Sequence, residues 1–143
     1  MWEYEYAVES NADAGVLWRL WSDVAGWPRW NAGIARIEIA GAFAVGTVFR
    51  MTPPGDEEPI EMRLTEVVAG ERFTDEMDAG DFVVRTEHRL EATGGGTRVV
   101  YRTEITGPAA GEVGPQLGPA ITADFPDVVA ALVRQALDEQ VRV

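Results

Sequence analysis

Apolar and acidic residues alternate at the start of the chain, in the order WEYEYAV, and predict a strand over residues 2–8 with one buried face. Apolar residues then recur at helical spacing from Val16 to Val24, which predicts a helix with one buried stripe. Ser10 or Asn11 precedes this helix and can cap its first turn. The chain is therefore expected to begin with a strand followed by a short helix.

The pattern then changes to the two-residue period of strands. Before this change, Gly26 and Pro28 end the first helix, and a second short helical turn should carry Trp27 and Trp30. After residue 33, alternating segments are separated by turn signals, which predicts an antiparallel meander because tight turns join neighbouring antiparallel strands. The predicted strands span residues 34–41, 46–53, 59–68, 71–78, 81–93 and 96–106.

The C-terminal part combines a segment rich in glycine and proline with a helical pattern. Residues 107–119 contain so much glycine and proline that we expect an irregular loop, which would act as a mobile lid over a cavity. A long amphipathic helix should follow, in which Pro126 either introduces a kink or lies in the first turn. This helix is the only long amphipathic element available to cover the sheet, so the pattern predicts an α+β fold, in one domain of residues 1–143.

Charges select a register for the last two predicted strands. A turn at Gly94-Gly95 opposes unlike charges across the pair, whereas a turn one residue later opposes like charges. The favoured register pairs Leu90 with Val99, His88 with Tyr101, Thr86 with Thr103, Glu91 with Arg98, Glu87 with Arg102 and Arg85 with Glu104.

Two-residue turns at Ala79-Gly80 and Ala69-Gly70 predict which residues lie side by side on neighbouring strands of the inward face of the sheet. They place Glu71 beside His88, and they direct Glu66 and Asp75 inward unless a bulge turns either carboxylate to solvent. In this register Asp75 is roughly 13 Å from the row of His88, too far for a catalytic pair. An enclosed carboxylate of this kind would have a raised pKa.

The composition excludes several kinds of chemistry. The formal net charge is −12, which argues against nucleic acid and against anionic membranes, since both attract clustered cations. The chain has no cysteine and no lysine, so thiolate metal sites and lysine Schiff bases are excluded. His88 is the only histidine, so a multi-histidine metal site is excluded as well. We therefore expect no metal and no cofactor.

The start of the chain is acidic and unlike a signal peptide, and no apolar run is long enough to span a membrane. These features predict a cytoplasmic protein without membrane insertion. The sequence leaves open whether it is a monomer or a homodimer.

Three segments together resemble the START-like superfamily, also called SRPBCC. They are LWRLWSDVAGWPRWN after the first strand, Gly46 with Phe49 in the third strand, and HRLEATGGGTRVVYR ahead of the last helix. The superfamily includes pollen-allergen-like proteins, lipid-transfer domains and polyketide cyclase/dehydrase-like proteins. The resemblance covers essentially the whole chain and is specific for fold rather than activity, because these motifs are mainly structural.

The resemblance implies a helix-grip fold, in which a curved seven-stranded antiparallel sheet wraps around a long C-terminal helix. Two short helices follow the first strand, and a cavity lies between sheet and helix. The tryptophans of the first segment would then close one end of the sheet, because each can bury roughly 150–250 Å². Trp30 lies near the expected cavity mouth, so it either has this structural role or contacts the ligand.

The cavity is the expected site of function. His88 and Tyr101 are the sharpest chemical candidates, either as an acid–base pair or as buried groups, with His88 satisfied by Tyr101 or by the backbone. The methionines either adapt the pocket to an irregular ligand or belong to the core. The expected ligand-binding residues are Trp30, Phe49, Met51, Met62, Leu64, Phe73, Met77, Phe82, Val84, Thr86, His88, Tyr101, Thr103, Ile121, Phe125 and Val129.

Three functions fit these expectations. The first is binding or transport of a small hydrophobic molecule, lipid-like or polyketide-like, without catalysis. The second is a cofactor-independent cyclase or dehydratase that uses His88 and Tyr101 as acid–base and orienting groups. The third is a protein-interaction module. A binder should show an apolar cavity, an enzyme a convergent polar cluster, and an interaction module a filled core with an exposed apolar patch.

Overall fold

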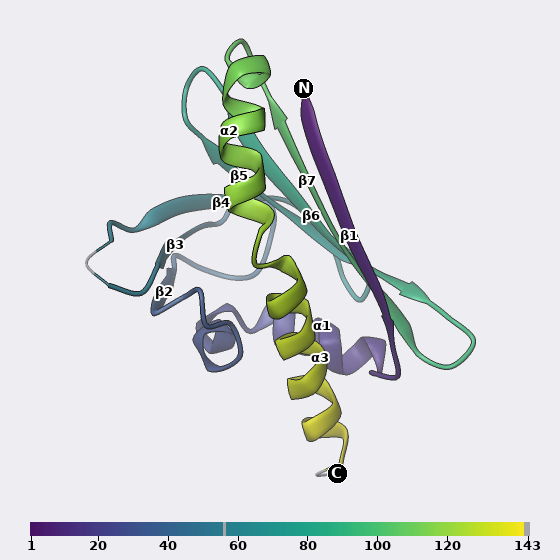
Figure 1. Cartoon of the computed structure of the whole chain (residues 1–143). Coiled ribbons are helices and arrows are strands. Elements are labelled where there is room, and N and C mark those ends of the chain that lie inside the picture. Colours follow the sequence, from purple (N-terminus) through teal and green to yellow (C-terminus); the bar gives the residue numbers. More distant parts are fainter. Residues whose placement is uncertain (56, 142–143) are drawn as a thin grey trace.

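One curved antiparallel sheet and the helices against its concave side make up the computed structural model, which describes residues 1–55 and 57–141 (Figure 1). Within these residues, seven strands are arranged in the order β1-β7-β6-β5-β4-β3-β2. The elements are β1 (Trp2–Ser10), α1 (Ala14–Ser22), the 3-10 helix η1 (Val24–Arg29), β2 (Arg36–Ile39), β3 (Val48–Thr52), β4 (Ile60–Val68), β5 (Arg72–Asp78), β6 (Val83–Ala92), β7 (Thr97–Thr106), α2 (Ala110–Thr122) and α3 (Phe125–Val141). This is the helix-grip arrangement expected from the sequence.

The tryptophan-rich segment closes one end of the sheet, as expected. Trp21 of α1 is fully buried and Trp27 of η1 nearly so. The Trp27 indole Nε1 donates to the backbone oxygen of Trp21 at 3.0 Å, which fixes η1 against α1.

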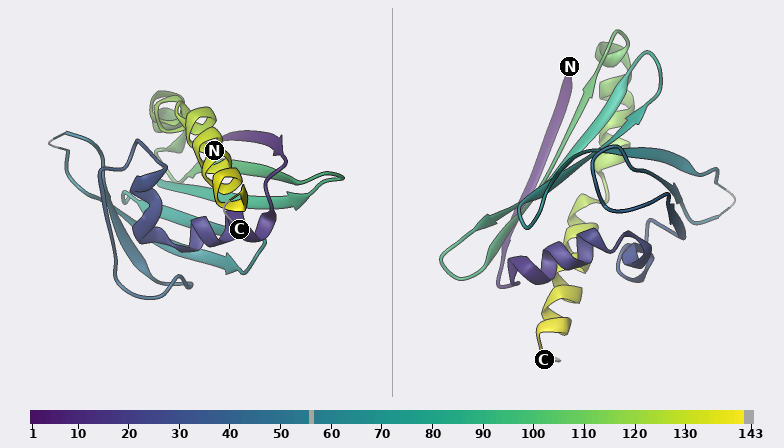
Figure 2. Two further views of the ribbon diagram at one scale, coloured as in Figure 1. Left: turned by 90° about the horizontal axis from the view of Figure 1, so that it is seen from below. Right: turned by 180° about the vertical axis from the view of Figure 1, so that it is seen from behind.

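The N-terminal cap of α1 differs from the prediction. Asp13 accepts from the Val16 backbone N–H, while Ser10 donates to the Thr97 carbonyl instead. Helix α1 also packs against α3 (Figure 2).

The register of β6 and β7 is the one selected by charge. Leu90 pairs with Val99 and His88 with Tyr101, and all three predicted charge pairs are opposite each other. The neighbouring hairpin differs, because the connection from β5 to β6 is two residues longer than the predicted turn. His88 therefore lies opposite Phe73 rather than Glu71.

A bulge between Leu64 and Glu66 changes the pairing of β4 with β5. It turns Glu66 to the outer face of the sheet, where its carboxylate accepts from Arg72 at 3.1 Å and from the Thr74 hydroxyl at 3.4 Å. Asp75 pairs with Leu64 as predicted and stays buried on the inner face. Of the two carboxylates expected inside, only Asp75 is inside.

Residues 107–119 do not form the irregular loop that we expected, because most of them belong to α2. Gly114 and Gly118 present a surface without side chains to Trp2 of β1, and a Cβ built on Gly118 would lie 2.5 Å from the indole. Burial of this large indole against the helix outweighs the weak helix propensity of glycine and proline. Only Ile121, near the end of α2, lines the pocket described below, so the segment does not cover its mouth as a lid.

The long C-terminal helix is divided in two. Helix α2 ends at Thr122, and α3 begins at Phe125 with Pro126 in its first turn, which is one of the two positions expected for this proline. The buried face of α3, which includes Val129, Leu132 and Ala136, gives the amphipathic helix predicted for this part of the chain. In the described ranges no helix has both the length and the apolar character needed to cross a membrane.

Candidate functional site

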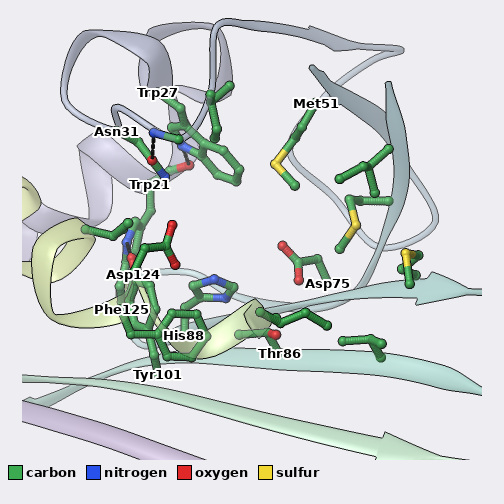
Figure 3. Close-up of a pocket in the computed structure, with 18 of the residues that line it drawn as sticks. Trp21, Trp27, Asn31, Met51, Asp75, Thr86, His88, Tyr101, Asp124 and Phe125 are labelled. Atoms are coloured by element: carbon green, nitrogen blue, oxygen red, sulfur yellow. Dashed lines mark hydrogen bonds between the residues drawn. The ribbon is translucent and has the colours of Figure 1, made fainter. Parts of the chain in front are cut away.

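A pocket of about 310 Å³ lies between the inner face of the sheet, η1 and the junction of α2 with α3 (Figure 3). Its walls are mainly aromatic and aliphatic. Most of the residues predicted to bind ligand line it, although ligand contact itself stays a prediction. These are Trp30, Met51, Met62, Phe73, Met77, Val84, Thr86, His88, Tyr101, Ile121 and Phe125.

Five predicted residues do not line the pocket. Three of them are fully buried in the core, namely Phe49, which packs edge-on against Trp27, and Leu64 and Val129. Thr103 is fully buried with its hydroxyl bonded to that of Thr86 at 2.9 Å. Phe82 lies in the loop before β6 and packs in a separate small cluster. Facing inward on the sheet was therefore not sufficient to reach the pocket.

Other lining residues were absent from the predicted set. They are Trp21, Trp27, Asn31, Gly33, Ile34, Ile60, Asp75, Asp124 and Val128. The sequence predicts only a structural role for Trp21 and Trp27, and it directs Asp75 inward but does not place it among the ligand-binding residues. Asp124 gave no signal in the sequence, because its position depends on the break between α2 and α3.

His88 is enclosed by aromatic rings. The Phe73 ring stacks on its imidazole with centroids 4.0 Å apart, and the Tyr101 ring meets it edge-on at 4.6 Å. The His88 Nδ1 lies 3.3 Å from the Phe73 backbone oxygen. A carbonyl oxygen can only accept, so Nδ1 carries the hydrogen and Nε2 is left as an unprotonated acceptor. The backbone alternative for satisfying His88 is therefore the one observed.

Burial makes His88 a poor proton acceptor. It lowers the pKa of His88 to about 3, because the charged imidazolium would lose its hydration among these rings, and hydrogen bonds to the Phe73 and Thr86 backbone offset this only in part. The imidazole is neutral at ordinary pH. Acid–base catalysis near neutral pH needs a group with a pKa in that range, so His88 does not suit the role considered for it.

Asp75 has the opposite shift from the same cause. Its side chain is only 5% exposed, and burial raises the pKa of its carboxyl to about 7. In the observed register Asp75 lies opposite Thr86, one row from His88, so the two are diagonal neighbours at about 7–8 Å rather than 13 Å apart. A carboxyl with this pKa can exchange a proton near neutral pH.

A second carboxylate faces the pocket from the other side. Asp124 lies at the junction of α2 and α3, and desolvation raises its pKa, with a smaller contribution from Asp127. The carboxylates of Asp75 and Asp124 point into the cavity from opposite sides of the His88 ring (Figure 3). Asp124 itself is exposed, which places it at the mouth of the pocket beside the exposed Gly33.

Tyr101 completes the polar set at the base of the pocket. Its hydroxyl accepts from the Trp21 indole Nε1 at 3.3 Å, so its own O–H hydrogen remains available to a ligand. Burial raises the pKa of Tyr101, and the carboxylates of Asp75 and Asp124 add to this, so the phenol stays neutral. The described residues contain no group of three metal-ligating side chains.

Comparison with known proteins agrees with the resemblance in the sequence. A family model described as polyketide cyclase / dehydrase and lipid transport matches residues 1–141. No curated protein matches the chain by sequence.

Solved structures share the fold at low sequence identity. Ara h 8.0201 superposes with a TM-score of 0.79 at 16% identity, over 95% of this chain and 97% of its own. Norcoclaurine synthase from Thalictrum flavum superposes with a TM-score of 0.74 at 18% identity, over 94% and 86%. The di-domain ARO/CYC StfQ of the steffimycin biosynthetic pathway gives 0.78 at 15% identity, over 99% of this chain and 52% of its own.

Proposed function

Since the chain belongs to the polyketide cyclase / dehydrase and lipid transport family, we propose that it binds a small, mainly hydrophobic molecule in the pocket beneath α3. The pocket carries this proposal, because a cavity of about 310 Å³ with aromatic and aliphatic walls and a few convergent polar groups is the usual form of a small-molecule site. Its volume lies at the lower end of the usual range, which favours a compact ligand over a long acyl chain.

The surface supports a ligand binder over an interaction module. Large exposed apolar side chains among the described residues are Met1, Tyr4, Val45, Ile60 and Val141. Met1 and Tyr4 lie at the start of β1 and Val141 at the end of α3, at opposite ends of the molecule (Figure 1), whereas an interaction surface gathers such residues into one patch.

A fluorescent probe tests ligand binding. The neutral apolar dye N-phenylnaphthylamine should bind with a saturable rise in emission. Met77→Trp places an indole in the pocket and should weaken binding by about tenfold or more, whereas Val45→Trp adds the same indole at an exposed position outside it and should have no effect. Equal binding by Met77→Trp, with an unchanged circular dichroism spectrum, would contradict the proposal.

The carboxyl of Asp75 supports a second candidate function, a cyclase or dehydratase without a cofactor. Asp75 would exchange the proton and the Tyr101 hydroxyl would orient a substrate carbonyl, while His88 acts only as an acceptor. Asp75→Asn should then reduce turnover of a cyclisable poly-β-ketone by about 10²–10⁴-fold with binding retained. Turnover unaffected by this substitution would exclude the role.

The proposal also covers the cellular location and the partners of the protein. We expect it to act in the cytoplasm, with a small molecule as its partner and without nucleic acid. The proposal applies to a monomer or to a homodimer.

A further inference from the structure

Asp75 is buried in the pocket without a side-chain partner. No side chain of residues 1–55 and 57–141 donates to its carboxylate, whose one stabilising contact is its own backbone N–H. The carboxylate points into the cavity rather than into the protein (Figure 3). Buried carboxylates are costly unless they are paired, so this group is set up to receive a partner from the pocket.

None of the described residues that line the pocket supplies a cation to this carboxylate. The chain has no lysine, and the described lining of the pocket contains no arginine. His88 is held neutral by burial and by its aromatic neighbours. Asp124 adds a second negative group at the mouth of the pocket. The charged groups among the described pocket residues are therefore both acidic, and their charge disfavours an anionic ligand.

The remaining walls also suit a cation. Trp27, Trp30 and Phe125 line the pocket, and Trp21 and Tyr101 form its base. The faces of such rings attract an ammonium group, and the attraction strengthens where water is excluded. A pocket that combines acidic groups with aromatic walls favours organic cations over neutral polar molecules of the same shape.

From this arrangement we infer that the ligand carries a protonated amine on a compact apolar body, with its ammonium group bound by Asp75 and its entry favoured by Asp124. The inference rests on the proposed function and specifies the class of ligand. An ammonium group would donate charge-assisted hydrogen bonds to the Asp75 carboxylate, which are about twice as strong as those from a neutral hydroxyl.

Three nearly isosteric probes separate this inference from its alternatives. Naphthylmethylamine, naphthylmethanol and naphthoate share the same ring system and differ in charge. Isothermal titration calorimetry near neutral pH should show the amine binding about tenfold or more tightly than the alcohol, and the anion most weakly. Equal or tighter binding of the alcohol would overturn the inference while leaving hydrophobic binding intact. Failure of all three to bind would overturn the proposed function itself.

Substitution of the carboxylate gives the second arm of the test. Asp75→Asn should bring amine affinity down to that of the alcohol and leave alcohol affinity nearly unchanged. Asp78→Asn is the matched control, because Asp78 is on the same strand but exposed and outside the pocket. A preference for the amine that survives in Asp75→Asn would place its cause elsewhere and overturn the assignment to Asp75.

The pH dependence of binding gives an independent readout. Amine affinity should rise from about pH 5 to about pH 8, because Asp75 has to lose its proton before it can pair with an ammonium. His88 and Tyr101 face it from β6 and β7 and stay neutral, while Asp124, from the helix junction, acts in the same direction. Alcohol affinity should not rise over this range, and a parallel rise for both probes would contradict the ammonium pairing.

Discussion

His88 and Asp75 show how one physical cause gives two neighbouring residues opposite behaviour. Both side chains are buried in the same pocket, one row apart on adjacent strands. Burial disfavours the charged form of each, so the pKa of the imidazole falls to about 3 and that of the carboxyl rises to about 7. The group best suited to proton exchange near neutral pH is therefore the carboxyl, and the imidazole acts as a neutral acceptor.

The single histidine makes its protonation state directly measurable. We expect the ¹⁵N shifts of the His88 imidazole in heteronuclear NMR to remain those of the neutral form protonated at Nδ1 from about pH 8 down to about pH 5. The reason is that burial keeps the ring neutral throughout this range. A titration with a midpoint near the ordinary value of about 6.5 would show that the ring is hydrated and not enclosed.

Asp75 should make the protein less stable as the pH rises. Its pKa is about 7 in the folded state against an ordinary 3.8, so the folded state holds the proton more tightly, and the free energy of unfolding falls between about pH 4 and about pH 7. Asp75→Asn removes this loss. Its stability advantage over the unsubstituted protein should grow by about 2 kcal/mol between pH 5 and pH 8, measured by urea unfolding.

Asp78→Asn provides the comparison for this measurement, because Asp78 is exposed on the same strand. The stability advantage of Asp75→Asn should grow with pH by more than any change in the stability difference of Asp78→Asn over the same interval. If the stability advantage of Asp75→Asn does not grow with pH, the carboxyl of Asp75 is solvated in the folded protein.

At the scale of elements, helix α2 depends on two glycines more than on its own helix propensity. Gly114 and Gly118 lie against the Trp2 indole, and neither has room for a Cβ. Gly111 belongs to the same helix but has open space around it. Replacing glycine with alanine should therefore have opposite effects on stability at Gly118 and at Gly111.

Gly118→Ala should destabilise the protein by about 1–3 kcal/mol, because the added methyl group would push α2 away from Trp2. Gly111→Ala should stabilise it by up to about 1 kcal/mol, because alanine favours the helix and nothing obstructs it. Thermal unfolding of both variants measures the contrast. Similar effects of the two substitutions would show that α2 does not pack closely on β1.

The sequence correctly predicted the elements that are determined by local patterns. The alternation and turn signals gave every strand to within about two residues, and paired charges gave the register of β6 with β7. The misplaced features depend on contacts between distant segments. Helix α2 requires Trp2, some hundred residues earlier, and neither the longer β5–β6 connection nor the bulge before Glu66 has a signature in the charge pattern.

The same distinction explains the partial prediction of the pocket. Residues predicted to face inward on the central strands, such as Phe73, Thr86 and His88, do line it. Asp124 joins them only because the C-terminal helix breaks at that point, and Asp75 approaches His88 only because of the longer connection between β5 and β6. Periodicity assigns a side chain to a face, whereas a pocket depends on how the faces meet.

At the scale of the whole molecule, the two faces of the sheet are chemically distinct. The outer face of its centre carries a network of ion pairs in which Arg89 contacts Glu87 and Glu91, and Arg102 contacts Glu3 and Glu104. The inner face holds the aromatic core and the pocket, with its acidic groups Asp75 and Asp124. These pairs are partly exposed, and surface pairs contribute little stability each, so the main energetic role falls to the inner face.

The central claim is that a small apolar molecule binds inside this pocket, and the methionines provide the most direct test. The pocket is lined by three methionines, Met51, Met62 and Met77. The fourth, Met1, is exposed directly before β1 and serves as an internal control. In a protein labelled with ¹³C at the methionine methyl groups, titration with naphthylmethanol should shift the three pocket signals along one common saturation curve, because the naphthyl ring current acts on all three. The Met1 signal should not move. Pocket signals that stay in place, or a shift confined to Met1, would contradict the account.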